Sequence, residues 1–269
     1  MSLHILMHDF VDDQRSILLL AGTGDGPRLA KLLQQQGWAV SVSVVTDAAA
    51  RSYGDLGVNG IRIGALGDES GIAALLQQQG PFRWVVDATH PFAVRISRDL
   101  TKVCCRLRQP LLRFERSVEP TGKASLLQNA AELRQAQLQG QRLLLAIGGR
   151  QLAAISSIAR AGGAELFARC LPSRDGIKAA LAAGLLPDRL AVLRPLQGAV
   201  PGAIERALCR RWGITAVLCR QSGGVSERLW HRLSEELELN LLLLQRPEPS
   251  TEVELVGDDA ALLDRIGDG

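Results

Sequence analysis

The residue types that could do chemistry begin with a glycine-rich segment near the N-terminus. The apolar run 16–21 leads directly into Gly22, Thr23 and Gly24, and a helical pattern starts at Pro27. Glycine lets backbone N–H groups approach an anion where a strand turns into the N-terminus of a helix. The dinucleotide fingerprint GxGxxG is incomplete, because Pro27 occupies the position of its third glycine. The segment is therefore compatible with a nucleotide site and with a plain strand-to-helix turn.

A second candidate set follows the next predicted strand, 39–45, and bears on the choice of nucleotide. Thr46, Asp47 and Arg51 lie there. In dinucleotide-binding folds an acid near this place holds the ribose 2′-hydroxyl of NAD, whereas an arginine accepts the 2′-phosphate of NADP. Asp47 is equally compatible with a helix cap and Arg51 with a solvated side chain. Spacing alone leaves this choice open.

The histidines narrow the candidates for acid–base chemistry. Two of the four lie near the N-terminus, which leaves His90 and His231. At the end of the predicted strand 84–87, the run from Asp87 to Thr89 leads into His90. Ligands of open α/β sheets bind beyond the carboxyl ends of strands, so His90 is the better placed. The alternative is a turn in which Asp87 and Thr89 bond to backbone and His90 is merely exposed.

Arginines and glycine turns follow several other predicted strands. Arginine outnumbers lysine 27 to 4, and its planar guanidinium binds carboxylate or phosphate through two hydrogen bonds. The alternatives are a compositional bias, solvated helix faces and purely structural turns. Repeated glycine turns at strand ends favour a binding cleft. The residues concerned are Arg113 and Arg116 beside strand 111–114, Gly148, Gly149 and Arg150 after strand 142–147, and Arg220, Ser222, Gly223 and Gly224 after strand 214–219.

The elements that must position these residues alternate along the chain. Short apolar runs predict ten strands, and helical patterns such as 27–36, 70–79 and 92–108 separate them. Parallel neighbours need a crossover helix, so the pattern predicts an α/β fold with parallel sheets. Ten strands are many for one twisted sheet, so we expect two domains with a cleft between them.

The expected domain boundaries fall in polar segments rich in proline and glycine. The chain divides into an N-terminal extension, 1–15, a first domain, 16–120, a second domain, 121–250, and an acidic C-terminal tail, 251–269, that holds a loop and a peripheral helix. A last strand that crosses back to the first domain remains an alternative.

Composition and missing signatures exclude several classes of protein. The net charge is +3 and aromatic residues make up 4%, so we expect no nucleic-acid partner. Five cysteines without a CxxC pair and an acidic N-terminus predict a cytoplasmic protein with reduced thiols. No apolar run is long enough to span a membrane, and no His/Cys spacing predicts a metal site. A reductase is compatible with this pattern, because the cofactor carries the hard chemistry.

Together the motifs resemble the precorrin-6A reductase family of cobalamin biosynthesis. The resemblance spans Ile17 to about Pro247 and rests on five segments in matching order, of which Asp-Ala-Thr-His-Pro-Phe-Ala at 87–93 is the most distinctive. The others are Gly22 to Ala30, Leu112 to Arg116, Gly148 to Leu152 and Ser222 to Gly224. The chain departs mildly from the family at Ala21, at Asp25 and at Arg220, where a glycine, a glutamate and a lysine are usual.

The resemblance implies two Rossmann-like domains and an NADPH-dependent reduction of a carboxylate-rich corrin precursor, either metal-free or cobalt-bound. Hydride would reach C19 of the macrocycle and a proton would be added at C18, with His90 or a water as donor. The residues implied to bind the cofactor are Gly22, Thr23, Gly24, Thr46, Arg51, Gly64, Asp87, Ala88 and Thr89. Those implied to bind the tetrapyrrole are His90, Ser97, Arg113, Arg116, Gly149, Arg150, Arg220, Ser222, Gly223 and Gly224. Other enzymes of the cobalamin pathway are candidate partners.

Two rival functions remain open at this level. A dehydrogenase of a small anionic metabolite would combine one Rossmann domain with a dissimilar substrate domain. A non-catalytic two-lobed protein would bind an anionic ligand without oxidising NADPH.

Overall fold

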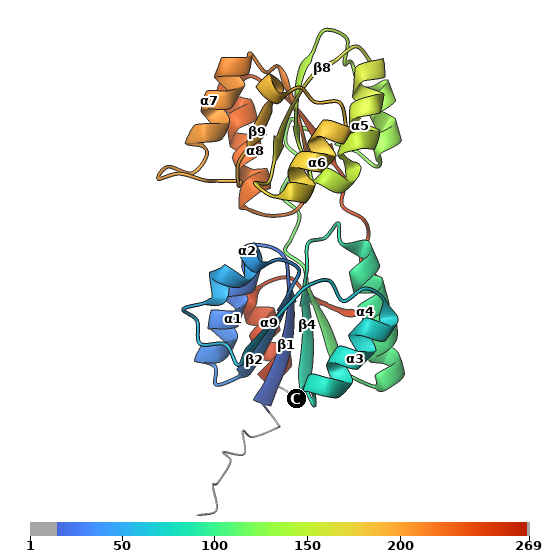
Figure 1. The fold of residues 1–269 in the computed structure, drawn as a ribbon, viewed down its shortest axis with the longest axis vertical. Helices are drawn as coiled ribbons and strands as arrows, with labels where there is room; N and C mark the ends of the chain where they lie inside the picture. Colours follow the sequence, from blue (N-terminus) through green and yellow to red (C-terminus); the bar gives the residue numbers. More distant parts are fainter. Residues whose placement is uncertain (1–14, 268–269) are drawn as a thin grey trace, which may run out of the picture. The chain divides into compact units, whose positions relative to one another are not determined.

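The structure of the protein is a computed structural model, and it describes residues 15–267. The chain divides into two compact units, one made of Met1–Ser117 with Pro247–Gly269 and the other of Val118–Arg246. Both are α/β units with parallel sheets, as the sequence predicts (Figure 1).

The first unit is a doubly wound sheet of six parallel strands in the order β12-β5-β4-β1-β2-β3. Its strands are β1 (Ser16–Ala21), β2 (Ala39–Val44), β3 (Gly60–Ile63), β4 (Trp84–Ala88), β5 (Leu111–Phe114) and β12 (Glu254–Val256). Its helices are α1 (Asp25–Gln35), α2 (Asp47–Ala50), the 3₁₀ turn η2 (Arg51–Tyr53), α3 (Glu69–Gln79), α4 (Val94–Leu107) and α9 (Asp259–Gly267).

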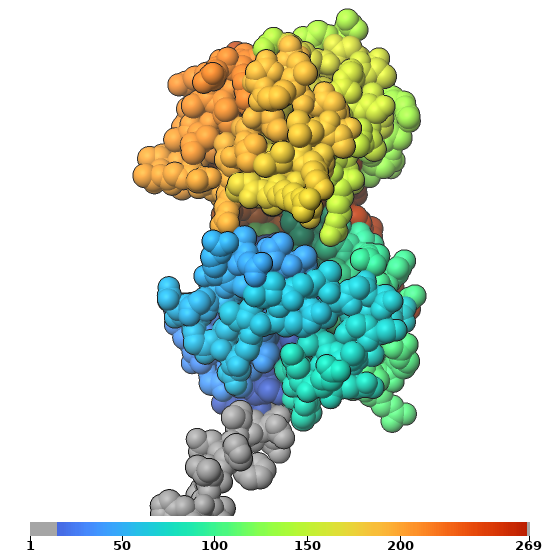
Figure 2. All heavy atoms as spheres, viewed as in Figure 1, coloured from blue at the N-terminus to red at the C-terminus, as the bar shows by residue number. Residues whose placement is uncertain are grey.

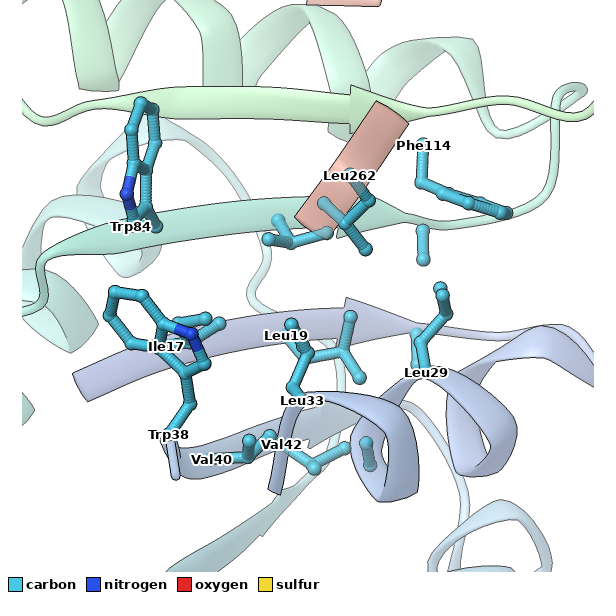
Figure 3. Packing of buried hydrophobic residues seen from close by; sticks show 14 of the residues in the cluster. Ile17, Leu19, Leu29, Leu33, Trp38, Val40, Val42, Trp84, Phe114 and Leu262 are labelled. Carbon is cyan, nitrogen blue, oxygen red and sulfur yellow. The ribbon is translucent and has the colours of Figure 1, made fainter. Parts of the chain in front are cut away.

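Helices cover both faces of this sheet, and successive side chains of the central strand β1 point to opposite faces. Ile17 and Leu19 of β1 pack on the face that α1 and α9 cover, where Leu33 and Leu262 lie (Figure 3). Leu18 belongs to the core of the opposite face, beneath α3 and α4. In the space-filling view little of the dark-blue β1 is visible, because lighter blue and cyan segments lie over it (Figure 2). Strands buried on both faces read as continuous apolar runs, which is why β1 is recognisable in the sequence.

The second unit has the same architecture, with six parallel strands in the order β6-β11-β10-β7-β8-β9. Its strands are β6 (Ser125–Leu127), β7 (Arg142–Ala146), β8 (Glu165–Cys170), β9 (Leu190–Val192), β10 (Ala216–Arg220) and β11 (Asn240–Leu244). Its helices are α5 (Gly149–Ala161), α6 (Arg174–Ala182), α7 (Ala203–Trp212) and α8 (Val225–Leu237), with the 3₁₀ turns η3 (Ala130–Gln135) and η4 (Pro187–Arg189).

Two short edge strands refine the domain organisation expected from the sequence. β6 lies near the start of the expected second domain, 121–250, and it pairs with β11 of the second unit. β12 lies in the expected C-terminal tail, yet it pairs with β5 of the first unit. The chain therefore crosses back after Arg246, and the first unit is discontinuous in sequence. The N-terminal extension 1–15 lies outside the described residues apart from Arg15.

Candidate functional site

The carboxyl edge of the first sheet has its topological switch point between β1 and β4. From β1 the strand order runs to β2 and β3 on one side and to β4, β5 and β12 on the other. Ala21, the last residue of β1, is in register with Ala88, the last residue of β4. The turn at Gly22 and the segment at Thr89 and His90 therefore lie side by side where ligands of such sheets bind.

The glycine turn has the free space that a diphosphate needs. A Cβ added at Gly22 or Gly24 would meet no atom within 4 Å, and both residues are exposed. At Gly26 a Cβ would lie 2.0 Å from the Tyr53 hydroxyl and 2.7 Å from Cβ of Ala21. The glycine that allows α1 to pack closely on β1 is therefore Gly26, one residue before the position occupied by Pro27. The turn fits the backbone role of a dinucleotide motif despite its incomplete fingerprint.

The residues predicted near the nucleotide's ribose lie beyond β2 and β3. Thr46 is the N-cap of α2, and its hydroxyl accepts the Ala49 N–H at 3.2 Å. The helix cap is thus Thr46 rather than Asp47, which lies exposed in the first turn. Arg51 is exposed at the start of η2. Gly64 follows β3 with a φ of +116°, a conformation that glycine adopts without strain.

A buried charge network lies beneath the β4 end of the crevice. The Asp87 carboxylate accepts the backbone N–H of Thr89 at 3.0 Å and its hydroxyl at 2.7 Å. The Arg113 guanidinium lies 2.8 Å from Asp87 and 3.1 Å from Glu115, and it donates to the hydroxyls of Thr89 (2.9 Å) and Ser97 (3.1 Å). The side chains of Asp87 and Arg113 are 3% and 5% exposed. These contacts give Arg113 the role of positioning Thr89 and Ser97.

His90 is half-buried and its imidazole has a defined orientation. Its Nδ1 accepts the backbone N–H of Phe92 at 3.2 Å, so in the neutral ring the proton is assigned to Nε2. An imidazole held through Nδ1 presents Nε2–H as a donor. As a general acid His90 would act from its protonated form, in which Nδ1 carries a proton and no longer accepts the Phe92 N–H.

The second unit has its own switch point, between β7 and β10, and Arg220 lies there. Ala146 near the end of β7 is in register with Cys219. A Cβ on Gly148 would lie 3.3 Å from the Arg220 guanidinium, so this side chain passes close to the N-terminus of α5. Burial, followed by the charges of Arg150 and Arg169, lowers the pKa of Arg220 to about 10. Gly149 and Arg150 begin α5 and are exposed.

The third predicted turn is closed by a residue that the sequence analysis missed. The Glu227 carboxylate, fully buried, accepts the backbone N–H groups of Ser222 (2.5 Å) and Gly223 (2.6 Å). Gly224 is the N-cap of α8. This is not the usual capping box, because the N-cap is a glycine and Glu227 bonds the two residues before the N-cap rather than the N-cap N–H. Because Glu227 occupies these amides, the turn offers its Ser222 side chain rather than these two N–H groups.

A buried ion pair that the sequence analysis did not predict, between Arg169 and Glu205, holds the loop after β9. The Glu205 carboxylate, 1% exposed, accepts the Leu196 N–H at 2.9 Å and lies 3.4 Å from the Arg169 guanidinium. Both Arg169 and Arg220 lie within the second sheet's carboxyl half, and the partner that fixes Arg169 comes from α7. Nothing in the local sequence signals this pairing.

Comparison with known proteins identifies the family. The family model described as "Precorrin-6x reductase CbiJ/CobK" matches residues 16–266. The chain belongs to this family. A cobalt-precorrin-6A reductase of Synechocystis sp. is 33% identical over 244 residues, covering 88% of this chain and 91% of the relative. A precorrin-6A reductase of Mycobacterium tuberculosis is 29% identical over 234 residues, covering 86% and 88%. A solved structure described as CobK precorrin-6A reductase superposes with a TM-score of 0.73 at 25% identity, covering 94% of this chain and 96% of that one.

Membership in the CbiJ/CobK family makes the chain an oxidoreductase. Each of its two α/β units contains a sheet of parallel strands. Within residues 15–267, no helix is both long and apolar enough to cross a membrane. The same residues contain no group of three or more histidine, cysteine or acidic side chains placed to hold a metal ion.

Proposed function

We propose that the protein is an NADPH-dependent reductase of precorrin-6A or its cobalt form in cobalamin biosynthesis. The observation that carries this proposal is the open glycine turn beside Thr89 and His90 at the switch point of the first sheet, in a chain whose family is named for this reduction. The open turn supplies a place for the cofactor diphosphate, and the neighbouring side chains supply polar contacts.

The first unit would hold the cofactor. Gly22, Thr23 and Gly24 would contact the diphosphate, and Arg51, exposed beyond β2, would accept the 2′-phosphate together with Thr46. Gly64 and the segment Asp87 to Thr89 would line the remaining nucleotide. When bound, NADPH supplies the hydride that the resemblance places at C19 of the macrocycle. The chain's own contribution is to bind and orient.

The second unit and His90 would hold the tetrapyrrole. Arg150 and Arg220 would bind acetate or propionate arms through charge-assisted hydrogen bonds, alongside Gly149, Gly224 and the Ser222 hydroxyl, whereas the Gly223 N–H stays bonded to Glu227. Ser97 would add a hydroxyl contact from α4. His90 would donate the proton to C18 from its protonated imidazolium form, in which Nδ1 no longer accepts the Phe92 N–H. We place this reaction in the cytoplasm, with other cobalamin-pathway enzymes as candidate partners.

The direct test is anaerobic incubation of the full chain with NADPH and either metal-free or cobalt-loaded precorrin-6A. The loss of NADPH absorbance during the incubation measures its oxidation. We expect oxidation that depends on the macrocycle, and the faster of the two forms identifies the substrate. His90→Ala should lower turnover, and unchanged turnover would remove His90 from proton delivery. Arg51→Glu should weaken NADPH binding relative to NADH, and an intact preference would refute the 2′-phosphate assignment.

The dehydrogenase alternative has less support from the fold. It requires a substrate domain unlike the first, whereas the second unit repeats the six-stranded parallel sheet. Oxidation of NADPH by a small anionic metabolite, without any by the macrocycle, would favour it. The non-catalytic alternative fails as soon as macrocycle-dependent oxidation is seen.

A further inference from the structure

A carboxylate is built into the turn that would hold the cofactor diphosphate. Asp25 is the first residue of α1, directly after Gly24, and as a whole residue it is 9% exposed. Its Oδ2 accepts the Thr23 hydroxyl at 3.1 Å, and its backbone N–H donates to the same hydroxyl at 3.2 Å. A negative charge favours the N-terminus of a helix, but it also repels an anionic ligand that approaches the same turn.

Two arginines from separate parts of the chain neutralise this carboxylate. Arg116, two residues after β5, places its guanidinium 3.2 Å from Oδ2 of Asp25. Arg28, one turn further along α1, lies 3.5 Å from Oδ1. The Arg28 guanidinium also pairs with Asp259 at the start of α9, and it stacks over the Phe114 ring at 5.6 Å. The four charged side chains sum to zero beside the glycine turn.

Arg116 is the member of this group that acts on Asp25 from outside the helix. Arg28 divides its charge between Asp25 and Asp259, and its side chain is 44% exposed. The Arg116 side chain is 25% exposed and that of Asp25 is 12% exposed, so water screens this pair less than it screens a surface pair. Removing Arg116 would leave the acidic members of the group in excess by one charge.

We propose that Arg116 is a positioning residue for the cofactor: by neutralising Asp25 it lets the turn at Gly22 to Gly24 accept a dinucleotide diphosphate. The inference rests on the proposed function for the presence of a dinucleotide there. It departs from the expectation that Arg116 contacts the tetrapyrrole. Arg116 determines the affinity for the anionic cofactor through Asp25 and without touching the reacting atoms.

The test measures NADPH affinity by fluorescence titration of the full chain, without substrate, for Arg116→Ala, Asp25→Asn and the double variant. Arg116→Ala should raise the dissociation constant on the order of tenfold, because one uncompensated unit charge beside the turn would repel the diphosphate in a partly solvated site. Adding Asp25→Asn to Arg116→Ala should restore affinity to within about threefold of the wild type, because a neutral side-chain amide at this position needs no cation beside it. The loss in Arg116→Ala should shrink as salt is raised, since salt screens the excess charge.

The matched control is Arg106→Ala, which removes a positive charge from the last turn of α4. The Arg106 side chain is 56% exposed and shares Glu69 with Lys102, and the end of α4 lies at the opposite edge of the sheet from the glycine turn. This variant should bind NADPH as the wild type does. Melting temperatures of all variants show whether a loss of affinity reflects a loss of folding.

The outcomes separate this inference from the proposed function. Wild-type affinity for NADPH in Arg116→Ala, with a raised KM for the tetrapyrrole, would overturn the inference and return Arg116 to the substrate. A loss that Asp25→Asn does not rescue would also overturn it, because a merely structural role predicts that result. A wild-type protein that binds no dinucleotide would refute the proposed function itself, and the inference with it.

Discussion

Replacing Arg113 by methionine should strongly destabilise the first unit. The Arg113 side chain is 5% exposed and lies between Asp87 and Glu115, whose side chains are 3% and 7% exposed. Methionine retains much of the apolar stem but removes the charge and the donors. Two buried carboxylates would then lose the guanidinium that both of them contact.

The magnitude follows from the cost of breaking a buried ion pair. Removing one partner of such a pair costs about 3–5 kcal/mol, because the other charge stays buried. The loss of the hydrogen bonds to the Thr89 and Ser97 hydroxyls lowers the free energy of unfolding further. For a unit of this size the melting temperature falls roughly 2–4 °C per kcal/mol. We therefore expect Arg113→Met to melt roughly 6–20 °C lower.

Scanning calorimetry of the full chain provides the assay. Arg113→Lys should fall between the wild type and Arg113→Met, because an ammonium keeps the charge but cannot reproduce the planar set of donors. Arg106→Met is the control for loss of an exposed arginine, and it should melt within about 1 °C of the wild type. A melting temperature for Arg113→Met within about 3 °C of the wild type would refute the view that Arg113 compensates buried charge.

Three further predictions concern a buried charge, the thiols and the packing of α1. Arg220→Met should raise the melting temperature by a few degrees, because burial lowers the pKa of Arg220 to about 10. The pKa in the folded state then lies below the pKa in the unfolded state, so the charged form costs the folded state on the order of 1–3 kcal/mol at neutral pH. This cost falls only as the pH rises past 10. A lower melting temperature would contradict this sign. In the native protein at pH 8, one thiol per chain, that of Cys105, should react rapidly with a disulfide reagent. Burial raises the pKa of Cys104 to about 12 and that of Cys209 to about 11, and it also raises the pKa values of Cys170 and Cys219. A second fast-reacting thiol would contradict this burial. Gly26→Ala should lose about 1–3 kcal/mol of stability and weaken NADPH binding, because its Cβ would overlap the Tyr53 hydroxyl; Tyr53→Phe in the same chain should recover part of the loss, and equal losses with and without it would contradict the overlap.

The sequence predicted the long elements well because each carries a clear apolar period. Strands such as β1 and β4, buried on both faces, appear as short apolar runs, Ile17 to Ala21 and Trp84 to Val86. β6 and β12 have three residues each, too few for a period to show, and their pairing is set by distant strands. The crossing of the chain back to β12 therefore required the three-dimensional structure.

Side-chain roles at strand ends were harder to predict than the strand ends themselves. Arg113 was expected to face a ligand, but register places it directly beside Asp87 on the neighbouring strand, and this contact between distant residues decides where the guanidinium lies. Asp25 and Arg116 also meet although they are far apart in the sequence. Glu227 lies three residues after the N-cap Gly224, but a glycine at the N-cap does not complete the capping-box signature, so its bonds to Ser222 and Gly223 required the structure.

The most direct test of the central claim is the fate of the hydride. Anaerobic turnover with NADPH deuterated at the transferred position of the nicotinamide, in ordinary water, should give a reduced macrocycle one mass unit heavier than the product made with unlabelled NADPH, with the deuterium at C19. A product without deuterium, or no product from either the metal-free or the cobalt-loaded precursor, would contradict the assignment of this chain as the reductase.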